Sequence, residues 1–143
     1  MIEVSEIRRR LRQALDKAKR ANAERRARAD AGARAYDVFI TDTATPVFRM
    51  FAAALRAEGY PFSVFTPAGG LRLMSERSND DFIELFLDTG ADPPIVAGRV
   101  NRGRGRRLIT AERPLRENTG VEQLTDEDVT EFLLRELTPF LER

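Results

Sequence analysis

The chain has no histidine, no cysteine and no tryptophan among its 143 residues. Without histidine or cysteine it cannot form a Ser-His-Asp triad, a Cys-His nucleophile or the usual zinc and copper sites. Lysine is limited to Lys17 and Lys19, which nearly excludes phosphate chemistry that needs a lysine. Only hard cations held by carboxylates stay open. We therefore predict no catalytic residue, no metal site and no cofactor.

Long apolar runs and a signal peptide are also missing. No uninterrupted apolar run approaches the length of a bilayer span, and the acidic Glu3 and Glu6 stand where a signal peptide is basic. The absence of cysteine agrees with a reducing compartment. Arginine fills 22 of the 24 basic positions, which a GC-rich bacterial genome would produce. We expect a bacterial cytoplasmic protein with no membrane partner and no evident small-molecule substrate.

What the chain does have is charge, and the charge comes in alternating blocks. Residues 1–34 hold 11 Lys/Arg against 5 Asp/Glu, and residues 35–97 hold 4 against 9. Residues 98–116 hold 7 against 1, and residues 117–143 hold 2 against 8. Such blocks create local fields that steer charged partners, unless the blocks neutralise one another inside the fold. The sequence leaves both alternatives open.

The apolar spacing predicts one domain over residues 1–143 with helices at both ends. Residues 1–34 read as a long charged helix, for which Gly32 is a plausible end. A second helix is expected over residues 36–59, with Thr45 and Pro46 at a helix start. The part before Pro46 also has strand propensity, so residues 35–45 are open between helix and strand. A last helix over residues 121–142 begins at Thr125, where Asp128 completes a variant of the capping box.

Between the helices, residues 61–113 change to a period of two residues. Apolar pairs two positions apart form five short runs, separated by turn residues rich in Gly, Pro, Asn and Asp. This pattern predicts an antiparallel meander of about five strands. The fold class is therefore α+β, in the order α-α-β-β-β-β-β-α. Phe82 and Phe86 fall on the outer face of the third run, which indicates that something partly covers them.

An arginine-glycine hairpin at residues 99–107 is a candidate for nucleic-acid contact. Its arginines could approach phosphates closely because glycine removes side-chain obstruction. The alternative is a solvated hairpin whose arginines pair with Glu84, Asp88 or Glu112. No aromatic residue is interleaved with the arginines, so base stacking is not indicated. The expected contact residues are Arg99, Arg102, Arg104, Arg106 and Arg107, with Arg102 and Arg104 at the tip.

The N-terminal helix carries an apolar stripe at alternating spacings of three and four residues. Val4, Ile7, Leu11 and Leu15 form its strong half, and only alanine continues it. We expect a helix–helix contact at these four residues, with a protein partner or in a homodimer. The leading interpretation is a non-catalytic protein-interaction module, and the alternative is a nucleic-acid-binding module. The acidic residues Asp80, Asp81, Glu84 and Asp88 are interpreted as a turn and a solvated strand face, not as a metal site.

Overall fold

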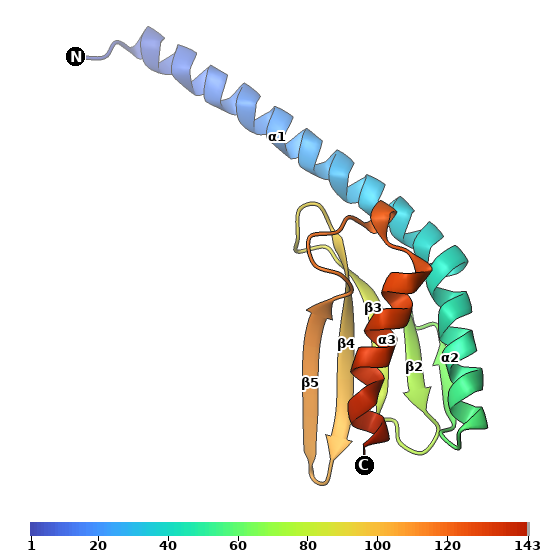
Figure 1. Cartoon of the computed structure of the whole chain (residues 1–143). Helices are drawn as coiled ribbons and strands as arrows, with labels where there is room; N and C mark the ends of the chain where they lie inside the picture. The colour runs from blue at the N-terminus through green and yellow to red at the C-terminus, as the bar shows by residue number, and fades with distance from the viewer. Residues whose placement is uncertain (143) are drawn as a thin grey trace.

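The computed structural model describes residues 1–142 and has a long N-terminal helical segment, a five-stranded sheet and a C-terminal helix. The order of the strands in the sheet is β1-β2-β3-β4-β5, and every neighbouring pair is antiparallel. This confirms the predicted α+β meander (Figure 1). In chain order, the elements are α1 (Val4–Phe39), the π-helical turn η1 (Ile40–Ala44), α2 (Thr45–Ala57), β1 (Phe62–Phe65), β2 (Gly70–Ser75), β3 (Phe82–Asp88), β4 (Ile95–Arg104), β5 (Arg107–Pro114), the 3-10 turn η2 (Val121–Gln123) and α3 (Asp126–Leu141).

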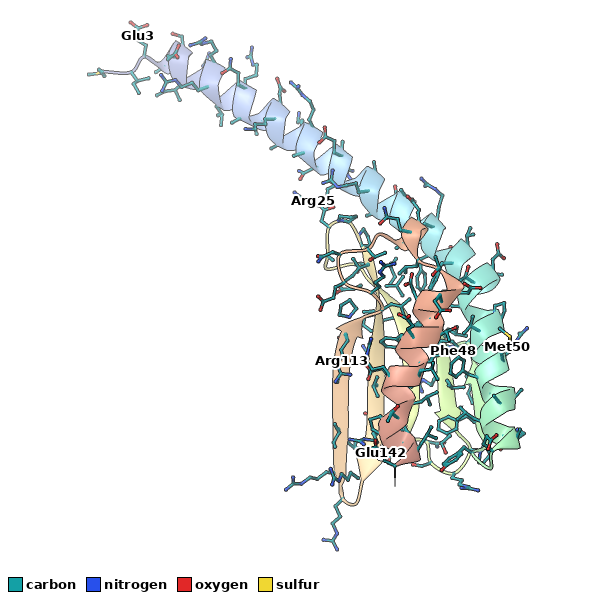
Figure 2. All side chains as sticks on the ribbon, in the orientation of Figure 1. Glu3, Arg25, Phe48, Met50, Arg113 and Glu142 are labelled. Atoms are coloured by element: carbon teal, nitrogen blue, oxygen red, sulfur yellow. The ribbon has the colours of Figure 1, made fainter. Side chains whose placement is uncertain are left out.

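The helices α2 and α3 cover one face of the sheet, and the core lies between the two layers. Leu71 of β2 pairs with Leu85 of β3, and both side chains are fully buried. Phe48 of α2 and Phe132 of α3 fill the space above them. Figure 2 shows the Phe48 side chain directed to the sheet, whereas Met50 points to the outside. The period-two pattern of β2 and β3 therefore identifies the covered face correctly, whereas the pair Ile95 and Ala97 of β4 lies on the opposite face with Phe86.

The chain forms one rod from Val4 to Ala57, which corrects the predicted boundary between helices 1–34 and 36–59. Residues 35–45 are helical, and Gly32 lies inside α1 instead of ending it. A Cβ at residue 32 would lie 3.1 Å from Cγ of Pro94, so glycine here permits close packing against the loop between β3 and β4. This packing explains a glycine that the sequence alone suggests as a helix end.

The wide π-turn precedes Pro46, and it marks where the rod changes from α1 to α2. Proline has no amide hydrogen and crowds the preceding turn, so a regular α-helical hydrogen bond cannot form there. The turn at Ile40–Ala44 takes up this misfit, and Thr45 Oγ1 donates a hydrogen bond of 2.6 Å to the Ile40 carbonyl. The predicted kink or break is thus a local widening within a continuous helix.

The last helix is shorter than the predicted 121–142. Val121–Gln123 forms a separate 3-10 turn against α1, and α3 begins after Thr125. The capping box is confirmed, because Thr125 Oγ1 accepts from the Asp128 amide at 3.3 Å and the Asp128 carboxylate accepts from the Thr125 amide at 2.9 Å.

The outer part of α1 projects away from the sheet and its helices (Figure 1). We call residues 4–27 the arm and residues 28–142 the body. Apart from Glu6, every residue of the arm is exposed. Figure 2 shows Glu3 and Arg25 at the two ends of this segment, clear of the sheet. At the usual helical rise, the arm is about 36 Å long.

By length and composition alone, the helix Val4–Ala57 contains one stretch apolar enough to cross a membrane. No such stretch is expected when only uninterrupted apolar runs are considered. Residues 38–55 contain the charged residues Asp42 and Arg49, but their average composition is still apolar. The buried side chains within this stretch include Phe39, Val47 and Phe48, which belong to the core.

Candidate interaction surfaces

The predicted apolar stripe lies along the arm with no cover. Val4, Ile7, Leu11 and Leu15 are between 51% and 68% exposed. With a rotation of about 100° per residue, all four side chains fall on one side of the helix. Their exposure is unusual for large aliphatic residues at coiled-coil spacing, which normally face another helix. The structure therefore brings these four residues together as a continuous surface.

Two ion pairs lie within the arm, both made by Glu6. Glu6 accepts from Arg9 at 2.5 Å and from Arg10 at 3.1 Å, and these hydrogen bonds, with that of Arg9 the stronger, lower the pKa of the Glu6 carboxyl. Exposed pairs of this kind contribute only a few tenths of a kcal/mol to about 1 kcal/mol. They support the helix but do not tie it to the body.

The first link between α1 and the body is the ion pair of Arg28 with Asp92. Arg28 donates from Nε and Nη2 to the two carboxylate oxygens, at 2.8 and 2.9 Å. The paired guanidinium lowers the pKa of Asp92, and the carboxylate raises that of Arg28. Asp92 comes from the loop between β3 and β4, 64 positions along the chain. This pair marks the base of the arm.

The five arginines of the predicted hairpin do not form one site. The turn lies between Arg104 and Arg107, which pair with each other in the register of β4 and β5. Arg102 is therefore inside β4 and not at the tip, and its Nη1 donates to the Pro139 carbonyl at 3.3 Å. Arg99 lies five residues before Arg104, and its side chain lies on the face of the sheet opposite to that of Arg102. Arg104, Arg106 and Arg107 remain at the tip, and they form no ion pair within the part of the chain that the structure describes.

Arg99 belongs to a row of alternating charges across the uncovered face of the sheet. Arg72, Glu84, Arg99 and Glu112 are direct cross-strand neighbours on β2 to β5. Glu84 lies 3.2 Å from Arg72 and 3.4 Å from Arg99, and Arg99 lies 2.9 Å from Glu112. The alternative interpretation, in which the hairpin arginines pair with Glu84, Asp88 or Glu112, thus holds for Arg99, which pairs with Glu84 and Glu112. The interpretation of Glu84 as solvated is wrong, since only 7% of the residue is exposed.

The same arginines cover the two phenylalanines on this face. The guanidinium carbon of Arg72 lies 4.0 Å from the ring centre of Phe82, and that of Arg99 lies 4.9 Å from Phe86. These are cation–π contacts. The cover predicted for Phe82 and Phe86 thus comes at least partly from the chain itself. The remaining acidic candidates do not converge: Asp81 accepts from the Gly103 amide at 2.9 Å, and among residues 1–142 no three His, Cys, Asp or Glu are placed to hold a metal ion.

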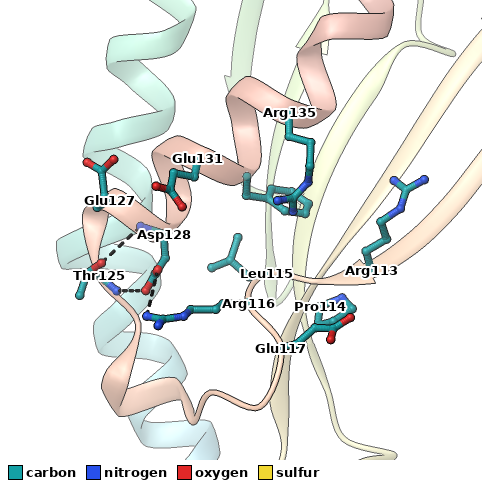
Figure 3. A pocket seen from close by; sticks show the side chains of 11 residues that line it. Arg113, Pro114, Leu115, Arg116, Glu117, Thr125, Glu127, Asp128, Glu131 and Arg135 are labelled. Atoms are coloured by element: carbon teal, nitrogen blue, oxygen red, sulfur yellow. Dashed lines mark hydrogen bonds and ion pairs between the residues drawn. The ribbon is translucent and has the colours of Figure 1, made fainter.

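A hollow of about 670 Å³ between the end of β5 and α3 is a feature that the sequence did not predict (Figure 3). Its arginines are already paired: Arg113 with Glu136 at 2.7 Å, and Arg116 with Asp128 at 3.3 Å. Arg135 lies 5.6 Å from the ring centre of Phe132. The basic and acidic blocks of the sequence therefore meet here. The hollow depends on how α3 folds back over the end of β5, so no local pattern could have indicated it.

A second feature missed by the sequence analysis is the outer surface of α2 and α3. Met50 is 62% exposed and Leu134 is 58% exposed, and each belongs to a helix whose other side packs on the sheet. A hollow of about 260 Å³ lies between the helices, lined by apolar side chains that include Phe51, Ala54 and Leu141. Each of these helices has more apolar residues than its sheet-facing side requires. This excess is the sequence signal that could have indicated the outer apolar surface.

Searches of protein families, curated proteins and solved structures found no match to this chain.

Proposed function

We propose that this protein is a protein-interaction module that binds its partner, or a second copy of itself, through the apolar stripe of the arm. The observation that carries the proposal is the exposure of Val4, Ile7, Leu11 and Leu15 on one side of the arm, in which every residue except Glu6 is exposed. A sustained apolar surface of this kind is typical of an interaction site.

The size of the stripe indicates a reversible complex. Full burial of one aliphatic side chain contributes about 1.5–3 kcal/mol. The loss of translational and rotational freedom on association opposes this gain by at least about 4 kcal/mol. Beyond Leu15 the stripe continues only as alanine, which buries little area. The proposal includes no catalytic step, in keeping with a chain that has neither histidine nor cysteine.

The double substitution Ile7→Asp and Leu11→Asp tests this function. Both side chains lie in the arm and contact nothing in the body, so the thermal unfolding of the body should stay unchanged at low protein concentration. We expect the self-association or partner binding of the unmodified protein to be lost, because the charges would have to be buried. Sedimentation velocity over a concentration series measures this effect.

The matched control is Gln13→Asp with Ala27→Asp. Both residues are exposed on the opposite side of the arm, and the change in net charge is the same. Association should survive in this control. If the variant of Ile7 and Leu11 associates as well as the control, the stripe is not the interaction surface.

A second candidate function is nucleic-acid binding by the hairpin tip. The observation in its favour is that Arg104, Arg106 and Arg107 lie together at an exposed turn without ion pairs in the described chain. Three phosphate contacts would give a log–log dependence of affinity on salt with a slope of about −2.7 on duplex DNA.

Oligonucleotide titrations at two salt concentrations test this candidate. We expect salt-sensitive binding by the unmodified protein and none by a variant with Arg104, Arg106 and Arg107 changed to Ala. Changing Arg113 and Arg116 to Ala is the control, because both arginines are paired with α3. Equal binding by both variants, or no binding at low salt, would contradict a nucleic-acid site at the tip.

A further inference from the structure

The seam between α2 and α3 carries two hollows on the outside of the body, a mixed polar and apolar one above a mainly apolar one, and we call the two together the groove. Its upper half is lined by Pro46, Val47 and Met50 together with Thr125, and has a volume of about 370 Å³. Its lower half is the hollow described above, lined by Phe51, Ala54, Leu134 and Leu141 among others. From Asp42 to Glu58 the α2 side of the groove is about 24 Å long at the usual helical rise.

The charges at the rim of this groove are acidic. Asp42 and Asp126 line its upper half, Glu58 lines its lower half, and no Lys or Arg lines either half. None of these three carboxylates forms an ion pair with another of residues 1–142. The groove therefore favours an apolar helix that is flanked by basic residues.

The arm matches this description. Its stripe from Val4 to Ala18 is about 21 Å long, close to the length of the groove. Arg8 and Arg12 flank the stripe on one side, and Arg10 and Lys17 flank it on the other. An arm that enters the groove would place apolar side chains on Met50 and Leu134 and basic side chains near the acidic rim.

Charge also disfavours the pairing of one arm with another. The arm, residues 4–27, holds 9 basic against 3 acidic residues, so two paired arms would bring together segments of the same sign. The body, residues 28–142, holds 14 basic against 19 acidic residues and therefore has the opposite sign. Juxtaposed like charges cost binding energy, whereas complementary charges speed and orient association.

We infer that the arm of one copy docks in the groove between α2 and α3 of a second copy. The arm cannot reach the groove of its own body, because α1 continues into α2 as one helix and the arm points away from the seam (Figure 1). Two copies that exchange arms reciprocally form a closed two-fold dimer. This inference rests on the proposed function of the arm and names the surface that the arm binds.

Cysteine cross-linking of the full chain tests the inference, since the chain has no cysteine of its own. One variant carries Leu11→Cys in the arm and a second, isotopically labelled, carries Leu134→Cys in the groove. Both positions are more than half exposed, so neither substitution removes a core side chain. After mixing under mild oxidation, mass spectrometry should find the mixed disulfide about tenfold above the controls, because docking raises the effective concentration of the two thiols.

The controls replace one position at a time. Gln13→Cys places the thiol on the opposite side of the arm, and Leu108→Cys places it on β5, where the residue is 60% exposed. A mixed disulfide that forms no faster than these controls overturns the groove. A dominant disulfide between two Leu11→Cys arms also overturns it, but that result would support the proposed function of the stripe.

A charge exchange gives a second readout that does not depend on thiol geometry. Changing Asp42 and Glu58 to Lys should abolish association of that variant with itself. Mixing it with a variant in which Arg8 and Arg12 are changed to Glu should restore association, because the rim and the arm again have opposite signs. Failure of the mixture to associate, while the unmodified protein does, would overturn the inference.

Discussion

Gly98 lies beneath the ring of Phe132, where α3 crosses β4. A Cβ at this position would lie 2.2 Å from Cζ of Phe132, and the ring is almost fully buried. Neither group has room to move away, because both belong to the packed layer between sheet and helix. Glycine is therefore required here by the closeness of two elements and not by its backbone freedom.

We predict that Gly98→Ala destabilises the fold by about 1–3 kcal/mol, as expected for overpacking of a core. The measurement is the free energy of unfolding from urea denaturation. Gly103→Ala in the same strand is the control, because its Cβ would meet nothing closer than 3.5 Å. Similar unfolding energies for both variants would show that α3 can shift on the sheet.

Asp92 carries the pH dependence of the junction between α1 and the body. Its pKa is lowered in the folded protein, first by the hydrogen bonds from Arg28. The pair therefore contributes fully above the unfolded pKa of about 3.9 and is lost as the pH falls through the lower, folded pKa. NMR titration of the Asp92 carboxyl carbon should show this lowered pKa.

Arg28→Gln should raise the pKa of Asp92 toward its ordinary range. The pKa of Glu76 is lowered independently by Arg56 and Ser63, so it serves as the internal control and should stay unchanged. An Asp92 titration that Arg28→Gln leaves unaffected would mean that the two side chains do not pair in solution.

For the secondary-structure elements, the sequence predicts whether a segment is a helix or a strand better than it predicts where that element begins and ends. All five strands are confirmed, because turn residues separate them and apolar residues recur at every second position, although only some strands, such as β2, bury alternate side chains under the helices. The α3 start is confirmed because a capping box is local chemistry. The predicted boundary near Gly32 is wrong, because this glycine packs against Pro94, which is 62 positions away in the sequence. No local pattern reveals such a contact.

The candidate surfaces divide in the same way. The stripe on the arm is predictable, since it depends only on helical spacing within one segment. Glu84 and Arg102 are assigned wrongly from the sequence, because their surroundings depend on the strand register and on the position of Pro139. The groove between α2 and α3 requires knowledge of how two helices lie side by side, and it becomes visible only in the folded chain.

The whole molecule consists of a basic arm and an acidic body at two ends of the same chain. We predict that any self-association through the arm weakens as salt rises from about 0.05 M to about 0.5 M, because screening shortens the range of the attraction. Sedimentation equilibrium at the two concentrations measures the dissociation constant. Association that strengthens with salt would instead indicate a contact dominated by the apolar stripe or by repulsion between arms.

The continuity of α1 with α2 has a mechanical consequence. A partner held by a flexible tether is kept nearby but turns freely, whereas this chain has no loop between Val4 and Ala57. A partner bound at the outer end of the arm therefore sets the orientation of the sheet, because the rigid arm of about 36 Å connects the two. The angle between the arm and the sheet is set where Arg28 pairs with Asp92 and Gly32 packs on Pro94, ahead of the widened turn at Ile40–Ala44.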